Sequence, residues 1–133
     1  MIVSRASHRL AWVVAILLPL PADAFTAKNG MDAHQVGPTE IVVDYHPRRD
    51  ETDYWCAAGD FADRVFGVSG KTRLWRASEK PREAGRGIVF TLDPAKMVKG
   101  GGPSQFGTGP RDGSISVGMA IGNYCRQVWP YLW

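Results

Sequence analysis

The stretch DETDYWCAAGDFADRVFG, residues 50–67, decides the fold because it predicts the clearest helix in the chain. Thr52 is a suitable N-cap, the carboxylates at 50, 51 and 53 suit the positive end of the helix dipole, and Gly67 suits the end. At about 100° per residue, one face gathers the apolar side chains. That face holds Tyr54, Ala58, Phe61, Ala62 and Val65, with Trp55 beside it, whereas Asp60, Asp63 and Arg64 fall on the other side. We therefore expect an amphipathic helix with a single buried face.

Five other segments predict strands. They are residues 31–36, 39–45, 72–77, 87–92 and 114–121. The first two flank Gly37-Pro38 and predict a hairpin, which ends at His46-Pro47 because proline cannot donate to a ladder. The last segment alternates strictly, with Ile115, Val117, Met119 and Ile121 on one face. The order β-β-α-β-β-β with short links predicts an α+β domain, in which one helix packs on a face of an antiparallel sheet of about five strands.

Two segments read as exposed loops by composition. Residues 78–86 are charged and contain Pro81 and Gly85, and residues 99–113 are rich in glycine with little apolar content. The Gly107-Thr108-Gly109 run is not a phosphate-binding motif, because no Gly-Lys-Ser/Thr follows it.

The first 24 residues predict a cleavable secretory signal peptide. A basic start is followed by an apolar run over residues 10–20, and Ala22 and Ala24 supply the small residues at −3 and −1. The apolar run is too short for a transmembrane helix, which needs about 20 residues. We expect cleavage after Ala24, export to the periplasm or the medium, and no transmembrane segment in the mature chain. The mature chain then comprises one globular domain, residues 25–125, and an aromatic tail, residues 126–133.

The chain has two cysteines, Cys56 and Cys125, and in an exported protein they most simply form one disulfide. A bond that closes a loop of this length is worth about 4 kcal/mol in the chain-entropy model. Because Cys56 lies on the polar side of the predicted helix, we expect the bridge on the outside of the helix start, joined to the end of the last strand.

Cys56 is also the strongest candidate nucleophile, because a helix N-terminus lowers the pKa of a thiol. Its base would be His46, and Asp44, two residues away on the same predicted strand, could orient the imidazole. Nearby carboxylates oppose a thiolate, and a disulfide would consume the thiol. A small thiol-dependent or hydrolytic enzyme using Cys56 with His46 therefore remains the alternative, and a count of free thiols separates the two.

We expect neither a metal nor another cofactor. The hairpin places His34 opposite a residue near Val42, about 13 Å from His46 at strand rise. The sequence has no zinc-type or calcium-type ligand spacing and no Gly-x-Ser-x-Gly elbow. The net charge of +3 comes from interleaved acids and bases, which excludes a basic nucleic-acid footprint and leaves no nucleic-acid partner to expect.

The tail beyond Cys125 lies outside the predicted disulfide loop. Its aromatic residues, Trp129, Tyr131 and Trp133, either pack on their own domain, dock on a partner or touch a membrane interface. They are the candidate partner-binding residues, because apolar groups exposed together mark interaction sites.

The run from Asp53 to Asp60, with Gly87-Ile88-Val89-Phe90 and Ser116-Val117-Gly118 downstream, resembles a group of small exported bacterial proteins of unknown function. Its specific part is an aromatic residue followed by Trp-Cys-Ala-Ala-Gly-Asp, and the similarity spans most of residues 25–125. The resemblance implies an exported bacterial domain and transfers no activity. The sequence thus favours a non-catalytic binding module for a protein or an envelope component.

Overall fold

The computed structural model of the chain describes residues 25–78, 85–99 and 112–125. The predicted signal peptide, most of the two predicted loops and the aromatic tail with Trp129, Tyr131 and Trp133 lie outside these residues. In the described part, no helix has the length and apolar character needed to cross a membrane.

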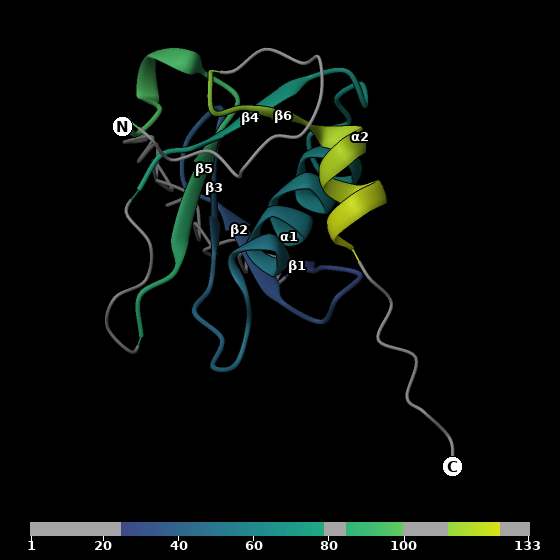
Figure 1. Cartoon of the computed structure of the whole chain (residues 1–133), viewed down its shortest axis with the longest axis vertical. Helices are drawn as coiled ribbons and strands as arrows, with labels where there is room; N and C mark the ends of the chain where they lie inside the picture. The colour runs from purple at the N-terminus through teal and green to yellow at the C-terminus, as the bar shows by residue number, and fades with distance from the viewer. Residues whose placement is uncertain (1–24, 79–84, 100–111, 126–133) are drawn as a thin grey trace, which may run out of the picture.

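Six strands form one antiparallel sheet in the order β1-β2-β3-β5-β4-β6 (Figure 1). The strands are β1 (Phe25–Thr26), β2 (Asp32–Gln35), β3 (Glu40–Val43), β4 (Arg73–Arg76), β5 (Ile88–Thr91) and β6 (Ile115–Ser116). The main helix, α1 (Glu51–Arg64), connects β3 to β4. The predicted α+β class is confirmed, with one strand more than expected, because the lead segment contributes β1.

The β2–β3 hairpin has the predicted register. His34 lies opposite Val42, and Ala33 lies opposite Val43. Because side chains alternate along a strand, Ala33, Val43 and their neighbours Ile41 and Phe90 face α1 and are buried. His34 and Val42 face the other way.

The helix begins two residues earlier than predicted. Its N-cap is Asp50, not Thr52, and the Asp53 carboxylate accepts a hydrogen bond from the Asp50 N–H at 3.0 Å. This is the reciprocal half of a capping box, in which the third helical residue reaches back to the cap. Gly67, just past the end, has a φ of +67°, so the predicted stop has the left-handed backbone that glycine tolerates.

The predicted last strand, residues 114–121, is wrong beyond its start. After β6 the chain turns into a short helix, α2 (Val117–Met119), continued by a π-helical turn, η2 (Ala120–Tyr124). Ser116 caps it by accepting a hydrogen bond from the Met119 N–H at 3.1 Å. The apolar residues that pack inward are Val117, Ala120, Ile121 and Tyr124. Their spacing is that of a helix face, whereas Met119, expected on the buried face, is 45% exposed.

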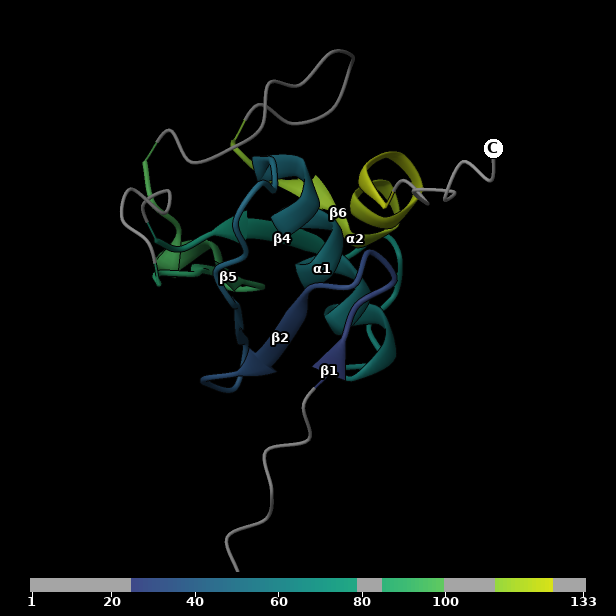
Figure 2. The same cartoon turned by 90° about the horizontal axis from the view of Figure 1, so that it is seen from below.

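The α2–η2 segment gives α1 a second packed side (Figure 2). Cys56 and Asp60, expected on the polar side, are fully buried, and Val65, expected on the apolar face, is 48% exposed. The prediction of a single buried face is therefore wrong for the middle of α1. The reason is tertiary: Cys56 is covered by a segment that the sequence predicts as a strand but that forms a helix, and Asp60 is bonded to the backbone of Lys28.

Candidate functional site

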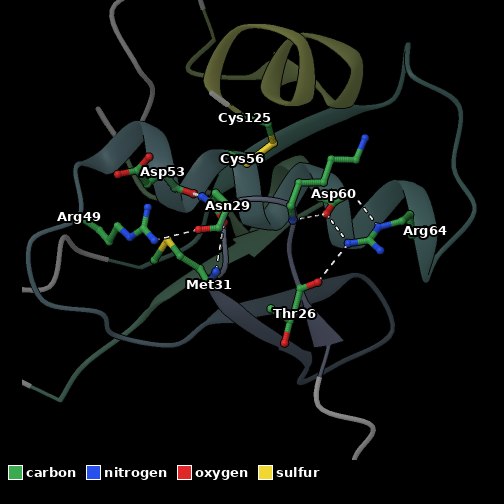
Figure 3. The surroundings of a disulfide bond; sticks show 10 residues. Thr26, Asn29, Met31, Arg49, Asp53, Cys56, Asp60, Arg64 and Cys125 are labelled. Atoms are coloured by element: carbon green, nitrogen blue, oxygen red, sulfur yellow. Dashed lines mark hydrogen bonds and ion pairs between the residues drawn. A yellow bond between two sulfur atoms is a disulfide. The ribbon is translucent and has the colours of Figure 1, made fainter. Parts of the chain in front are cut away.

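A disulfide joins Cys56 to Cys125 between α1 and the end of η2 (Figure 3). The predicted bridge is confirmed, and neither cysteine of the chain is a free thiol. Its surroundings differ from the expectation, because Cys56 is completely buried beneath η2 and does not lie on the outer surface of the helix. In this oxidised state Cys56 carries no thiol to act as a nucleophile.

The catalytic partners proposed for Cys56 are engaged elsewhere. β3 ends at Val43, so Asp44 and His46 do not lie on a common strand face as predicted. The Asp44 carboxylate lies 3.3 Å from Nδ1 of His34, and Nδ1 of His46 lies 2.8 Å from the Pro47 carbonyl oxygen. The structure thus pairs Asp44 with His34, and the expected Asp44–His46 arrangement is not the one observed.

Trp55 and Gly59 pack α1 against two different neighbours, the sheet and η2. The Trp55 indole meets Phe90 edge to face, with ring centroids 4.8 Å apart, and so joins α1 to the sheet. Gly59 faces η2 at such close range that a Cβ there would lie 2.7 Å from Cβ of Ala120. One side of α1 is therefore shaped for the sheet and the other for η2.

Asp60 is a fully buried carboxylate at the centre of a polar cluster (Figure 3). It accepts hydrogen bonds from Nε of Arg64 at 2.9 Å, from Nη2 of the same residue, and from the Lys28 backbone N–H at 2.8 Å. The bond to Asp60 raises the pKa of Arg64 above its ordinary value. Arg64 also donates to the Thr26 carbonyl oxygen at 3.1 Å and lies over the Phe25 ring, 4.5 Å from its centroid.

A second set of bonds holds the turn that follows β1. The Asn29 side chain donates to the Asp53 carbonyl oxygen at 2.8 Å and accepts from the Met31 N–H at 3.2 Å. Arg49 donates to the Asn29 carbonyl oxygen at 2.8 Å. Gly30 in this turn has a φ of +81°, which favours glycine. The segment from β1 to Met31 is thus bonded along the length of α1.

We name the contacts of Asp60 and Arg64 with residues 25–28 the N-terminal latch. Helical periodicity does not predict this latch, because it places both residues on the polar side of the helix. One signal for it is present in the sequence, the i, i+4 spacing of an acid and a base.

Arg76, a buried residue of β4, forms an ion pair with Glu51 at the start of α1. Nη1 of Arg76 lies 2.7 Å from the Glu51 carboxylate, and Arg76 is 5% exposed. Three buried donors, Nε of Arg76 and Nε1 of Trp55 and of Trp75, have no hydrogen-bond partner within the described residues. Trp75 is 8% exposed. The pair connects the start of α1 to β4.

Strand β4 anchors the chain on both sides of the glycine-rich segment. The Arg76 carbonyl oxygen accepts from the Val98 N–H at 2.9 Å. Nε of Arg73 donates to the Ser114 hydroxyl at 2.8 Å, and the Ser114 N–H donates to Asp112 at 3.0 Å. These bonds from Ser114, chiefly that of its side chain, hold the pKa of Asp112 below the usual range.

Within residues 25–78, 85–99 and 112–125, no three histidine, cysteine or acidic side chains gather in an arrangement that could hold a metal ion. The chain matches no protein-family model, no curated protein and no solved structure.

Proposed function

We propose that the chain is an exported, disulfide-stabilised binding module without catalytic activity, which engages a protein or a component of the cell envelope. One observation carries the proposal. Every residue from Tyr54 to Ala62, the most distinctive stretch of the sequence, is buried. Its reactive side chains, Cys56 and Asp60, are used by a disulfide and by the N-terminal latch.

Two features support export. The disulfide is of the kind that persists in oxidising compartments. The first 24 residues have the basic start, the apolar run and the small residues at −3 and −1 of a secretory signal peptide. We propose the periplasm or the medium as the location.

The proposed contact to the partner is the aromatic tail, with Trp129, Tyr131 and Trp133. Cys125 is fixed to α1 by the disulfide, so the residues after it can engage a partner without opening the domain. The alternative, a thiol enzyme using Cys56 with His46, requires the disulfide to be reduced first and gains no support from the positions of Asp44 and His46.

The test of binding uses the mature chain, residues 25–133, as bait in an envelope extract. Its matched control replaces Trp129, Tyr131 and Trp133 with alanine. We expect a component captured by the mature chain and lost with the control, while both proteins melt at the same temperature. A melting temperature lowered by several degrees in the control would instead mean that the tail packs on its own domain. Capture unchanged in the control would remove the tail from the proposal.

The test of the alternative is a thiol titration with an assay for hydrolysis. The folded mature protein is expected to show no free thiol and no turnover. Turnover that appears on mild reduction and disappears in a Cys56→Ala variant would favour the enzyme.

A further inference from the structure

We infer that the closed N-terminal latch protects the Ala24–Phe25 bond, so that the first 24 residues are removed only while β1 is not docked on α1. The inference rests on the export proposed above. It concerns the order of two events, cleavage and docking, that share the same few residues.

Phe25 would be the first residue after the cut, and it is already part of the fold. It pairs with Ala33 in the sheet. Its ring meets Phe61 edge to face, with centroids 5.1 Å apart, while the Arg64 guanidinium lies over the ring. No spacer separates the predicted cleavage site from the packed domain.

The residues that follow are bonded as well. The Thr26 carbonyl oxygen accepts from Arg64, and the Thr26 hydroxyl donates to Asp32 at 2.8 Å. Ala27, which is 5% exposed, donates its N–H to the Met31 carbonyl oxygen, and the Lys28 N–H is bound by the buried carboxylate of Asp60. Residues 25–28 are therefore hydrogen-bonded to and packed on the sheet and α1.

A peptidase binds an extended chain on both sides of the bond it hydrolyses, and it cuts a structured segment only when that segment opens. Here the reaction adds water to the Ala24–Phe25 peptide bond and leaves a carboxylate on Ala24 and an ammonium on Phe25. The catalyst is a membrane-bound signal peptidase of the exporting cell. With the latch closed, the residues that this enzyme must hold after the bond are occupied.

The experiment compares precursors of the full chain, folded and oxidised in detergent micelles, during digestion with purified signal peptidase. The key variant inserts Phe-Thr-Gly-Ser-Gly-Ser between Ala24 and Phe25. This insert preserves the residues on both sides of the cut, and it moves the domain six residues away without changing the domain itself. We expect the spaced precursor to be cut about tenfold faster or more, since an opening cost of about 1.4 kcal/mol is a factor of ten.

A second variant loosens the latch. Arg64→Lys keeps the charge but has no planar fork to bind Asp60 and Thr26 together, so its precursor should be cut faster than the wild-type chain. Lys71→Arg, an exposed exchange of one basic side chain for another outside the latch, serves as its control and should be cut at the wild-type rate.

Equal rates for the wild-type and spaced precursors would overturn the inference while leaving export intact. A spaced precursor that is not cut at all would overturn the cleavage site, and with it both proposals. Because the spaced variant leaves the folded domain unaltered, these outcomes stand even if Arg64→Lys does not fold.

Discussion

At the scale of single residues, the run from Tyr54 to Asp60 is a packing signature. Its members contact three different neighbours: Trp55 packs on the sheet, Cys56 and Gly59 contact the η2 segment, and Asp60 binds the N-terminal residues. A short motif that combines aromatic, small and polar residues can be mistaken for a catalytic site. Here the mixture follows from a helix that is packed on two sides and has different neighbours on each.

Gly59 provides the sharpest test of that packing. Alanine at this position would bring two Cβ atoms to 2.7 Å. Alanine is favoured over glycine in a helix by about 1 kcal/mol, but overpacking typically costs about 1–3 kcal/mol. We expect Gly59→Ala to lower the free energy of unfolding by about 1 kcal/mol, measured by urea denaturation.

The matched control is Gly122→Ala in η2, because nothing lies within 4 Å of the position of its Cβ. It should be neutral or stabilising. Adding Ala120→Gly to Gly59→Ala should restore part of the loss. If Gly59→Ala and Gly122→Ala behave alike, α1 and η2 are not in close contact.

The Asp60–Arg64 ion pair gives a second prediction about stability, because only one of its two side chains can be hydrated. The Arg64 side chain is 45% exposed and can be hydrated, whereas that of Asp60 is fully buried. Arg64→Ala leaves a buried carboxylate with Lys28 as its remaining donor, and we expect a loss of about 3 kcal/mol. The double variant Asp60→Ala/Arg64→Ala should lose less than the sum of the two single changes, because the unpaired charge is gone. Additive losses in a double-mutant cycle would mean that the two residues do not act together.

At the scale of elements, the α1 helix and strands β2 to β5 were predictable, and the segment after β6 was not. Apolar residues at 115, 117, 119 and 121 satisfy a strand pattern, while 117, 120, 121 and 124 satisfy a helix pattern. What decides between them is the surface of α1 that Gly59 opens, a contact made across about 60 residues of chain. The same long-range contact buries Cys56, whereas Asp60 is buried with the N-terminal residues that it binds, a second contact between residues distant in sequence.

The hydrogen bonds between Ser114 and Asp112, at the start of β6, predict how the stability of the protein depends on pH. The hydrogen bonds from Ser114 lower the folded-state pKa of Asp112, so this carboxylate stabilises the protein above its unfolded pKa of about 3.9. That contribution is lost as the pH falls through the lower, folded-state pKa. Asp112→Asn should therefore be less stable than the wild-type protein at pH 7, and the difference should shrink below about pH 4.

Glu40 has a pKa lowered chiefly by its hydrogen bond with Lys96 and titrates in the same acid range. The measurement is therefore the difference in melting temperature between the Asp112→Asn and wild-type proteins across pH, since Glu40 contributes equally to both. A difference that stays constant from pH 7 to pH 2 would contradict the role of Asp112.

At the scale of the whole molecule, the fold is a sheet with α1 on one face and the α2–η2 segment over the helix (Figure 1). The disulfide joins the helix to Cys125, which lies 69 positions along the chain from Cys56. The bridge thereby closes a segment of chain that contains β4, β5 and β6. A bond placed in this way restricts the unfolded chain more than it alters the folded one.

Loss of the bridge should therefore lower the free energy of unfolding by about 4 kcal/mol, a large part of the stability of a domain of this size. The suitable variant is Cys56→Ala with Cys125→Ser, because a serine hydroxyl in the buried position of Cys56 would add a desolvation cost of its own. Urea denaturation of this variant and of the reduced wild-type protein should give the same loss. If both proteins instead unfold at the same urea concentration as the oxidised wild-type protein, the contacts between α1 and η2 hold the fold without the bridge. If the loss is found, the domain is stable only where its disulfide forms, and its fold then depends on the oxidising compartment to which we propose it is exported.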